Sequence, residues 1–244
     1  MKGWLTGLAV VGVLVGALWL LFGRSGAEHR GAQRVRELAT HALGERVMAS
    51  GNAKRVLIVA NPFGTAGKLN REMQAMEDAG LRGLTASLSP KVASVVAIPE
   101  LRPGVLEDPR SVFIEPETTT PLSYLVTPEA FDQLARQNAE CDVIVSLIGL
   151  PADLTRVQCW QDSNGPKFAL LLPDLRHIGN RAALRRCFES GKLLVFVAVR
   201  PNAPTTATDT TGDWRAEFDR RFVLVTRENL DAMLAAYPQI FPPN

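Results

Sequence analysis

The chain has 244 residues, of which 46% are hydrophobic and 21% are charged. This composition is typical of a globular protein that carries an apolar leader. The 27 lysines and arginines nearly balance the 25 aspartates and glutamates, and no basic stripe follows the leader, so we expect no nucleic-acid partner. The three widely spaced cysteines indicate neither a disulfide framework nor a zinc site. We therefore expect no metal and no cofactor, and a bridge between Cys159 and Cys187 stays open.

Residues 4–22 contain no charged side chain. About 20 helical residues span the ~30 Å hydrocarbon core of a bilayer, and Trp4 and Trp19 lie where aromatic rings favour the headgroup layers. Residues 1–25 are therefore predicted to form a transmembrane anchor in the cytoplasmic membrane. The alternative is an export signal cleaved near the small residues 25–27, although the apolar run is longer than such signals need.

The residues on either side of this leader give conflicting indications of the side of the membrane on which the soluble domain lies. Four arginines follow it, whereas only Lys2 and the α-amino group precede it, which by the positive-inside rule places the domain in the cytoplasm. A tail of only Met1 and Lys2 before an apolar run is, in contrast, typical of an export signal. We favour a single-pass anchor with the soluble domain on the extracytoplasmic side.

Residues 26–52 are predicted to be a juxtamembrane helix or linker. Their apolar residues recur at helical spacing on one stripe, which consists of Val35, Leu38, Ala39, Ala42 and Leu43. This helix either continues the membrane helix or packs on the domain. Gly51 and Asn52 mark its end, so residues 53–244 are predicted to be a single α/β domain.

Within this domain, apolar runs alternate with segments of helical period, a pattern typical of βαβ units. The predicted strands are 55–60, 93–98, 142–148, 167–172, 192–199 and 221–226. Most of them are apolar throughout, as strands covered on both faces should be. We therefore predict a three-layer α/β sandwich around a mostly parallel, Rossmann-like sheet.

The helix signals fit between these strands. Apolar residues repeat at helical spacing after residue 69, and further helices are predicted to start at Thr127, at Asn180 as an N-cap and at Thr226. Residues 99–128 and 200–213 are long loops rich in Pro and Thr. Loops of this length in a compact domain tend to carry function.

The first strand runs into residues 61–68 (NPFGTAGK) and then into a helix, an arrangement that suits an anion. It is not a Walker A loop, because Pro62 stands at the first glycine and Leu69 replaces the magnesium-binding hydroxyl. The stretch resembles the opening of the diacylglycerol and sphingosine kinase domains. Those enzymes also need a GGDG loop, and residues 147–153 (LIGLPAD) lack it, so we disfavour a lipid kinase.

Residues 56–81 and 134–154 together resemble one lobe of the type I periplasmic binding proteins of the sugar-receptor kind. The shared features are the Asn-Pro-Phe element that opens the first helix, and a helix followed by Asp, an apolar strand and a Pro-Asp loop. This resemblance implies a ligand cleft lined by loops after the strand ends. It further implies that Phe63 stacks on a ligand ring while Asn61 and Asp153 hydrogen-bond to it.

Each of these residues also has a purely structural interpretation. Asn61 and the following proline form a strand-ending turn in that case, and Asp153 is a helix N-cap. No catalytic motif of the GxSxG or HExxH type occurs. Asp174 and His177 would form an acid/base pair if Ser146 lay beside them as a nucleophile, but we assign no catalytic residue.

The sequence therefore predicts a membrane-anchored, non-enzymatic domain that binds a small-molecule ligand or a protein partner. One alternative is a docking subunit of a membrane assembly, which would expose an unusually large apolar patch. Another is a membrane-associated enzyme that acts on a phosphorylated or lipid substrate, with perturbed pKa values near Lys68 or His177.

Overall fold

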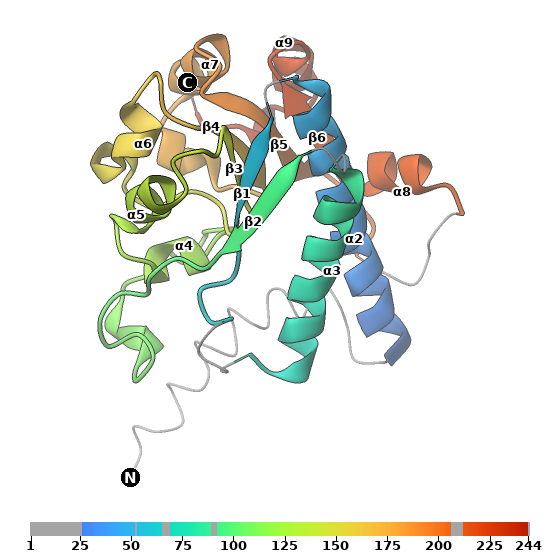
Figure 1. Ribbon diagram of the computed structural model, residues 1–244. Coiled ribbons are helices and arrows are strands. Elements are labelled where there is room, and N and C mark those ends of the chain that lie inside the picture. The colour runs from blue at the N-terminus through green and yellow to red at the C-terminus, as the bar shows by residue number, and fades with distance from the viewer. Residues whose placement is uncertain (1–25, 52, 65–68, 89–91, 206–211, 244) are drawn as a thin grey trace.

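The computed structural model describes residues 26–51, 53–64, 69–88, 92–205 and 212–243. Its strands form one sheet in the order β2-β1-β3-β4-β5-β6 (Figure 1). All neighbouring strands are parallel except β6, which runs antiparallel to β5. The strands are β1 (Arg55–Val59), β2 (Ala93–Ala97), β3 (Val143–Ser146), β4 (Lys167–Leu171), β5 (Leu193–Val199) and β6 (Phe222–Thr226). The predicted mostly parallel α/β sheet is thus confirmed.

Helices cover both faces of this sheet (Figure 1). The α-helices are α2 (Gly26–Ala49), α3 (Arg71–Ser87), α4 (Leu122–Leu125), α5 (Ala130–Gln137), α6 (Gln158–Gln161), α7 (Arg181–Glu189), α8 (Trp214–Arg221) and α9 (Leu230–Ala236). Short 3-10 turns are η1 (Pro109–Ser111), η2 (Leu154–Arg156), η3 (Leu175–Ile178) and η4 (Pro238–Ile240).

Two helix starts test the predicted caps. Asn180 caps α7 as predicted, since its Oδ1 accepts from the N–H of Ala183 at 2.9 Å. The last helix, however, begins at Leu230 and not at Thr226, which is the final residue of β6. Asn229 Oδ1 accepts from the N–H of Thr226 at 2.8 Å, so an Asn-closed turn separates the strand from the helix.

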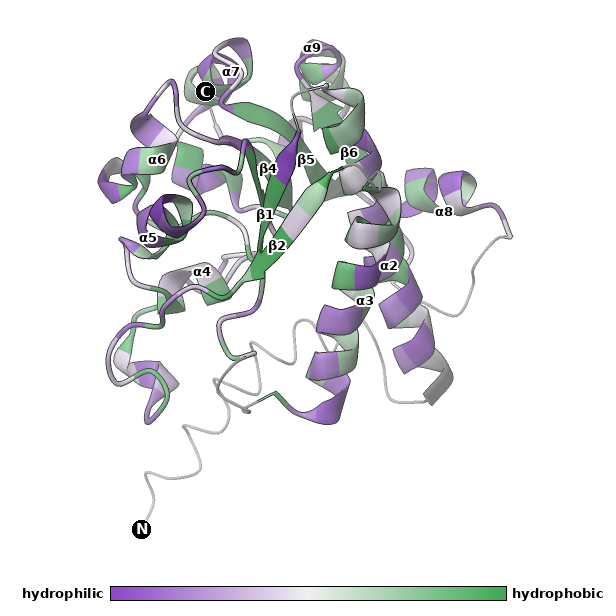
Figure 2. Cartoon of the chain, viewed as in Figure 1, coloured by the Kyte–Doolittle hydropathy of each residue, from purple (hydrophilic) through white to green (hydrophobic). Residues whose placement is uncertain are grey.

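The inner strands alternate their side chains between two cores, whereas the edge strand β2 is largely exposed or half-buried. In β1, Val56 and Ile58 face the layer of α2, α3 and α8, whereas Leu57 and Val59 face the layer of α5, α6, α7 and α9. All four are fully buried. Figure 2 shows mostly hydrophobic strands between helices that carry both hydrophilic and hydrophobic residues. The absence of polar alternation in these strands follows from this double coverage.

Helix α2 packs on the domain, which is one of the two arrangements that the sequence left open. Its predicted apolar stripe is buried in the same core as the facing residues of β1, β3, β4 and β5. It also packs against α3, where Arg36 and Glu77 form an ion pair at 3.0 Å. Residues assigned from the sequence to a linker thus contribute to the core.

The direction of α2 places its start at a defined end of the molecule. Because only a short turn separates Ala49 from Arg55, α2 runs antiparallel to β1 (Figure 1). Its first turns therefore lie at the carboxyl ends of the parallel strands. His29 Nε2 accordingly lies 3.5 Å from Oε2 of Glu72, at the start of α3.

The predicted transmembrane anchor, residues 1–25, lies outside the described residues. Within the part of the chain that the structure describes, no helix combines the length and apolarity needed to cross a membrane.

The three cysteines carry free thiols, so no bridge joins Cys159 and Cys187. Cys141 and Cys159 are buried, while Cys187 is half-buried. Burial raises the pKa of the Cys159 thiol to about 12. A thiol with such a pKa is a poor nucleophile near neutral pH.

The contact between α2 and α3 depends on a glycine. A Cβ atom at Gly83 would lie 2.0 Å from the carbonyl oxygen of Glu37 and 2.4 Å from Oγ1 of Thr40. In an exposed helix, replacing glycine with alanine stabilises by about 1 kcal/mol. Here we expect Gly83→Ala to lower the free energy of unfolding by about 1–3 kcal/mol, because the two helices must move apart. Denaturant unfolding measures the change.

Gly212→Ala is the control, since a Cβ atom there meets no neighbour within 4 Å among the described residues. It should leave the unfolding midpoint nearly unchanged. A stabilised Gly83→Ala variant would show that the helices are not in close contact.

Candidate ligand-binding site

The carboxyl ends of parallel strands meet at one edge of a sheet, where open α/β folds bind ligands. We call this edge the carboxyl edge; it comprises the ends of β1 to β5 and the segments that follow them. All three residues that the resemblance singles out follow β1 or β3 and belong to this edge. The described residues contain no group of three or more His, Cys, Asp or Glu side chains able to hold a metal ion.

Asn61 and Phe63 form the turn that ends β1. Asn61 is buried, and its Oδ1 accepts from the N–H of Phe63 at 3.0 Å. Its carbonyl also accepts from the N–H of Gly64 at 3.0 Å. The side chain therefore has the turn-forming role that the structural interpretation predicts. Phe63 is half-buried, and Lys68 lies outside the described residues.

Asp153 caps the short η2 turn. Its Oδ1 accepts from the N–H of Thr155 at 3.0 Å and from the Thr155 hydroxyl at 2.6 Å. The hydrogen bond from that hydroxyl lowers the pKa of the exposed Asp153 carboxyl. Among the described residues, no hydrogen bond joins Asp153 to Asn61 or Phe63, and ligand binding by these three residues stays a prediction.

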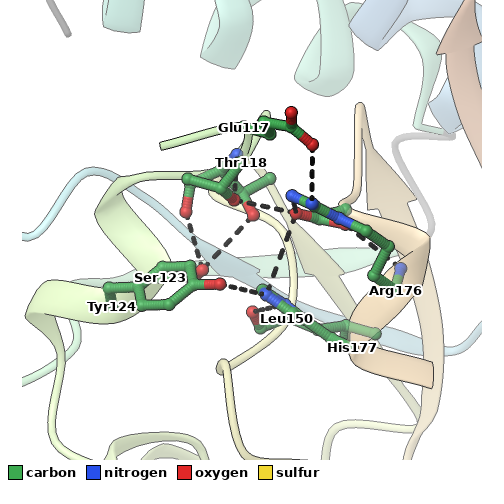
Figure 3. Close-up of polar contacts among 9 residues, drawn as sticks. Glu117, Thr118, Ser123, Tyr124, Leu150, Arg176 and His177 are labelled. Carbon is green, nitrogen blue, oxygen red and sulfur yellow. Dashed lines mark hydrogen bonds and ion pairs between the residues drawn. The ribbon is translucent and has the colours of Figure 1, made fainter. Parts of the chain in front are cut away.

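A group of hydrogen-bonded polar residues at this edge, which includes Thr118, Arg176 and His177 (Figure 3), centres on Asp174, which follows β4. Its carboxylate is 5% exposed. Arg176 donates to it through Nε at 2.9 Å and through Nη2 at 2.7 Å, and the Thr118 hydroxyl donates at 2.9 Å. Burial alone would raise the pKa of Asp174, but the bonds from Arg176 and Thr118 lower it. The carboxylate thus stays ionised and fixes the guanidinium group.

His177 joins this group to α4. Its Nδ1 lies 3.2 Å from the carbonyl oxygen of Leu150, and its Nε2 lies 3.1 Å from the hydroxyl of Tyr124. A carbonyl oxygen only accepts, so Nδ1 carries the proton and Nε2 accepts from the Tyr124 hydroxyl. Burial lowers the pKa of His177 and raises that of Tyr124, so both are neutral at pH 7.

Asp174 and His177 lie close together, as their proximity in the sequence suggested: His177 Nε2 is 4.0 Å from Oδ2 of Asp174. Ser146 plays a different role from the one considered for it. Its buried hydroxyl donates to the carbonyl of Gly149 at 2.5 Å and closes the turn after β3. Both ring nitrogens of His177 have partners within the protein, so this geometry holds segments in place and does not activate a serine.

A glycine positions the segment that supplies Thr118 and Tyr124. Gly149 has a φ of +82°, and a Cβ atom there would lie 2.5 Å from Cγ2 of Thr120. Only glycine lets Thr120 approach so closely. The sequence marked residues 99–128 as a functional loop but did not identify Tyr124, because its partner lies 53 positions along the chain.

A separate hollow of about 700 Å³ lies at the opposite edge, between the ends of α2 and α7 and the strands β4, β5 and β6. Arg46, Lys167 and Arg227 line it, and Arg46 pairs with Glu228 at 2.5 Å. Arg46 belongs to the last turn of α2, where a cation offsets the partial negative charge of the helix carbonyls. We assign no ligand to this hollow.

No family model matches the chain, and no curated protein matches it. Among solved structures, it is similar to a carbohydrate transporter from Acidothermus cellulolyticus 11B in complex with myo-inositol, with 11% identity, a TM-score of 0.46, and coverage of 84% of this chain and 62% of that one. It is also similar to the substrate-binding protein of a sugar ABC transport system from Bordetella parapertussis 12822, with 11% identity, a TM-score of 0.47, and coverage of 86% and 61%.

A third similar structure is a periplasmic solute-binding protein of an ABC transporter from Actinobacillus succinogenes 130z with bound D-allose, with 12% identity, a TM-score of 0.42, and coverage of 81% and 62%. The chain therefore spans about three fifths of the length of these proteins. They are sugar-binding proteins of the class that residues 56–81 and 134–154 resemble.

The neutral state of His177 makes stability depend on pH. Its folded pKa lies below the ordinary value of about 6.5, so the unfolded chain takes up the proton first as the pH falls. We expect the free energy of unfolding to decrease as the pH drops below about 6.5. Denaturant unfolding at a series of pH values measures this slope.

The control is His177→Gln, which removes the titrating ring. Its slope below about pH 6.5 should be flatter than that of the wild type. Equal slopes would mean that His177 is not held neutral.

Proposed function

We propose that the chain is a membrane-anchored, non-enzymatic domain that binds a small polar molecule at the carboxyl edge of its sheet. The observation that carries this proposal is the hydrogen-bonded group around Asp174, which fixes polar side chains from two separate segments at the edge where such sheets bind ligands. Fixed donors and acceptors favour binding, because little side-chain entropy is lost when the ligand arrives.

The hydrogen bonding favours binding over catalysis. A general base needs a lone pair that can reach the substrate. In this group the Nε2 lone pair of His177 accepts from Tyr124, and the carboxylate of Asp174 accepts from Arg176 and Thr118. Arg176 alone combines a fixed position with substantial exposure, at 42% of its side chain. It is therefore the polar group of this cluster that we propose to contact the ligand.

We retain Asn61, Phe63 and Asp153 as proposed ligand contacts. Phe63 is half-buried beside the end of β1 and offers an aromatic face, while Asp153 is exposed and ionised. Sugars and polyols combine apolar ring faces with hydroxyl groups that both donate and accept. They are also the ligands that the resemblance to sugar receptors implies, so they are the probes to test first.

A panel of monosaccharides and inositols, added to the purified full chain in detergent, tests this proposal by thermal unfolding. A bound probe at about a hundredfold excess over its Kd should raise Tm by about 5–10 °C. Phe63→Ala and Asp153→Ala should each weaken Kd by about tenfold, the effect of losing one contact. Glu228→Gln, at the opposite edge, is the control and should bind as the wild type does.

If a probe raised Tm of both variants as much as it raises Tm of the wild type, the binding site would lie elsewhere. Chemical conversion of the probe would favour the enzyme alternative. A stoichiometric protein that copurifies with the chain while no probe binds would favour the docking-subunit alternative.

We propose the extracytoplasmic side for the domain, because Lys2 followed by the apolar run at residues 4–22 has the form of an export signal. Alkaline phosphatase fused after Asn244 should be active in a bacterial host, because this reporter folds only outside the cytoplasm. The same fusion without residues 1–25 is the control and should be inactive. An inactive full-length fusion, accompanied by an intact protein band, would place the domain in the cytoplasm.

A further inference from the structure

The chain enters the domain at the carboxyl edge. The predicted span ends at residue 22, and α2 begins at Gly26. The four steps between these positions reach at most about 14 Å even when fully extended. The start of α2 would therefore lie close to the surface of the bilayer. The end of α2, at Ala49, lies about 36 Å farther along a helix of this length.

Because α2 is buried along the sheet, the position of this helix relative to the bilayer also sets the position of the rest of the domain. Val35, Leu43 and Val47 are at most 4% exposed, and they pack on strands of the sheet. Figure 1 shows the start of α2, the carboxyl edge and the segment after β2 at the same lower end of the molecule. The end that receives the chain is thus also the end that holds the candidate site.

Two large hydrophobic side chains are exposed at this end, Leu106 at 43% and Phe113 at 76%. Leu106 and Phe113 belong to the projecting segment 99–117. Phe and Leu side chains can insert at the boundary between the headgroups and the acyl chains of a bilayer, and burial there removes their apolar surface from water.

The charge of this segment decides which lipid surface fits. Residues 99–117 contain five acidic residues and two arginines. An anionic surface would repel such a segment. Contact must therefore rest on the tether and on the apolar side chains, and a zwitterionic headgroup layer is the matching surface.

We propose that the carboxyl edge faces the bilayer, with Phe113 and Leu106 at the level of zwitterionic headgroups. This inference rests on the anchored, ligand-binding function proposed above. It goes beyond that function, because it makes the ligand site open toward the membrane surface. A ligand then reaches Arg176 through the water between the domain and the bilayer surface.

Nitroxide spin labels on the full chain in phosphatidylcholine vesicles test this orientation. One label is placed by Phe113→Cys and the control label by Ala49→Cys, which is exposed at the far end of α2. Both variants carry Cys187→Ser, while the buried Cys141 and Cys159 stay in place. For each label, we compare the collision rate with oxygen, which partitions into lipid, and the collision rate with a nickel chelate, which stays in water.

We expect the label at residue 113 to show several-fold higher relative oxygen accessibility than the label at residue 49. Equal, water-like values in a chain that floats with the vesicles and still binds its sugar or polyol probe would overturn the orientation and leave the proposed function standing. A chain that does not float with vesicles would remove the anchor, and this inference with it. Spin–spin broadening at residue 113 that grows with protein density would show that a second copy covers Phe113, which also overturns the proposal.

Discussion

The packing of α2 across the sheet is the constraint on which the rest of the structure depends. The sheet is apolar on both faces, and α2 is the longest element that covers one of them. Burial of a single Leu or Val side chain stabilises by about 1.5–3 kcal/mol, and α2 contributes a full stripe of them. Glycines on both helices, Gly83 on α3 and Gly44 on α2, allow this close approach. A helix that begins directly after the leader is therefore an integral layer of the domain.

Buried polar groups hold the other face of the sheet in place. Lys192, at the start of β5, donates from its buried Nζ to the carbonyls of Cys159, Asp162 and Pro166. Asp132 on α5 accepts from the N–H groups of Gln158 and Cys159 at 2.9 and 2.6 Å. Both tie the α6 region, which is too short to be stable alone, to the sheet. Removing one partner of such a group leaves a buried charge or dipole unsatisfied, which costs far more than losing a surface pair.

The parts of this structure that the sequence predicts are those that local pattern determines. Strands that are apolar throughout must be covered on both faces, so the runs around Ile58, Val145 and Phe196 were sufficient to predict the layered sheet. The cap at Asn180 follows from local chemistry in the same way. The antiparallel direction of β6 could not be predicted, because a strand and its reverse have the same apolar pattern.

The candidate site was less predictable, because its bonds join distant positions. Thr118 and Asp174 are 56 residues apart, and Tyr124 and His177 are 53 apart. Contacts between residues so far apart in the sequence cannot be inferred from the spacing of neighbouring residues. Asn61 and Asp153 illustrate the converse, since both were singled out as ligand contacts and both also make the local turn and cap bonds that their residue types favour anywhere.

The solvent exposure of each partner of Arg176 determines which of its bonds a ligand can replace. The bonds between Arg176 and the buried Asp174 are short and shielded from water, so a ligand cannot replace them without leaving a buried charge unpaired. On its other side, Arg176 Nη1 lies 3.7 Å from Oε2 of Glu117, whose side chain is 87% exposed. A pair of that kind is worth about 0–1 kcal/mol. A ligand oxygen that binds Arg176 would therefore displace Glu117 at little cost, while Asp174 keeps the guanidinium group in position.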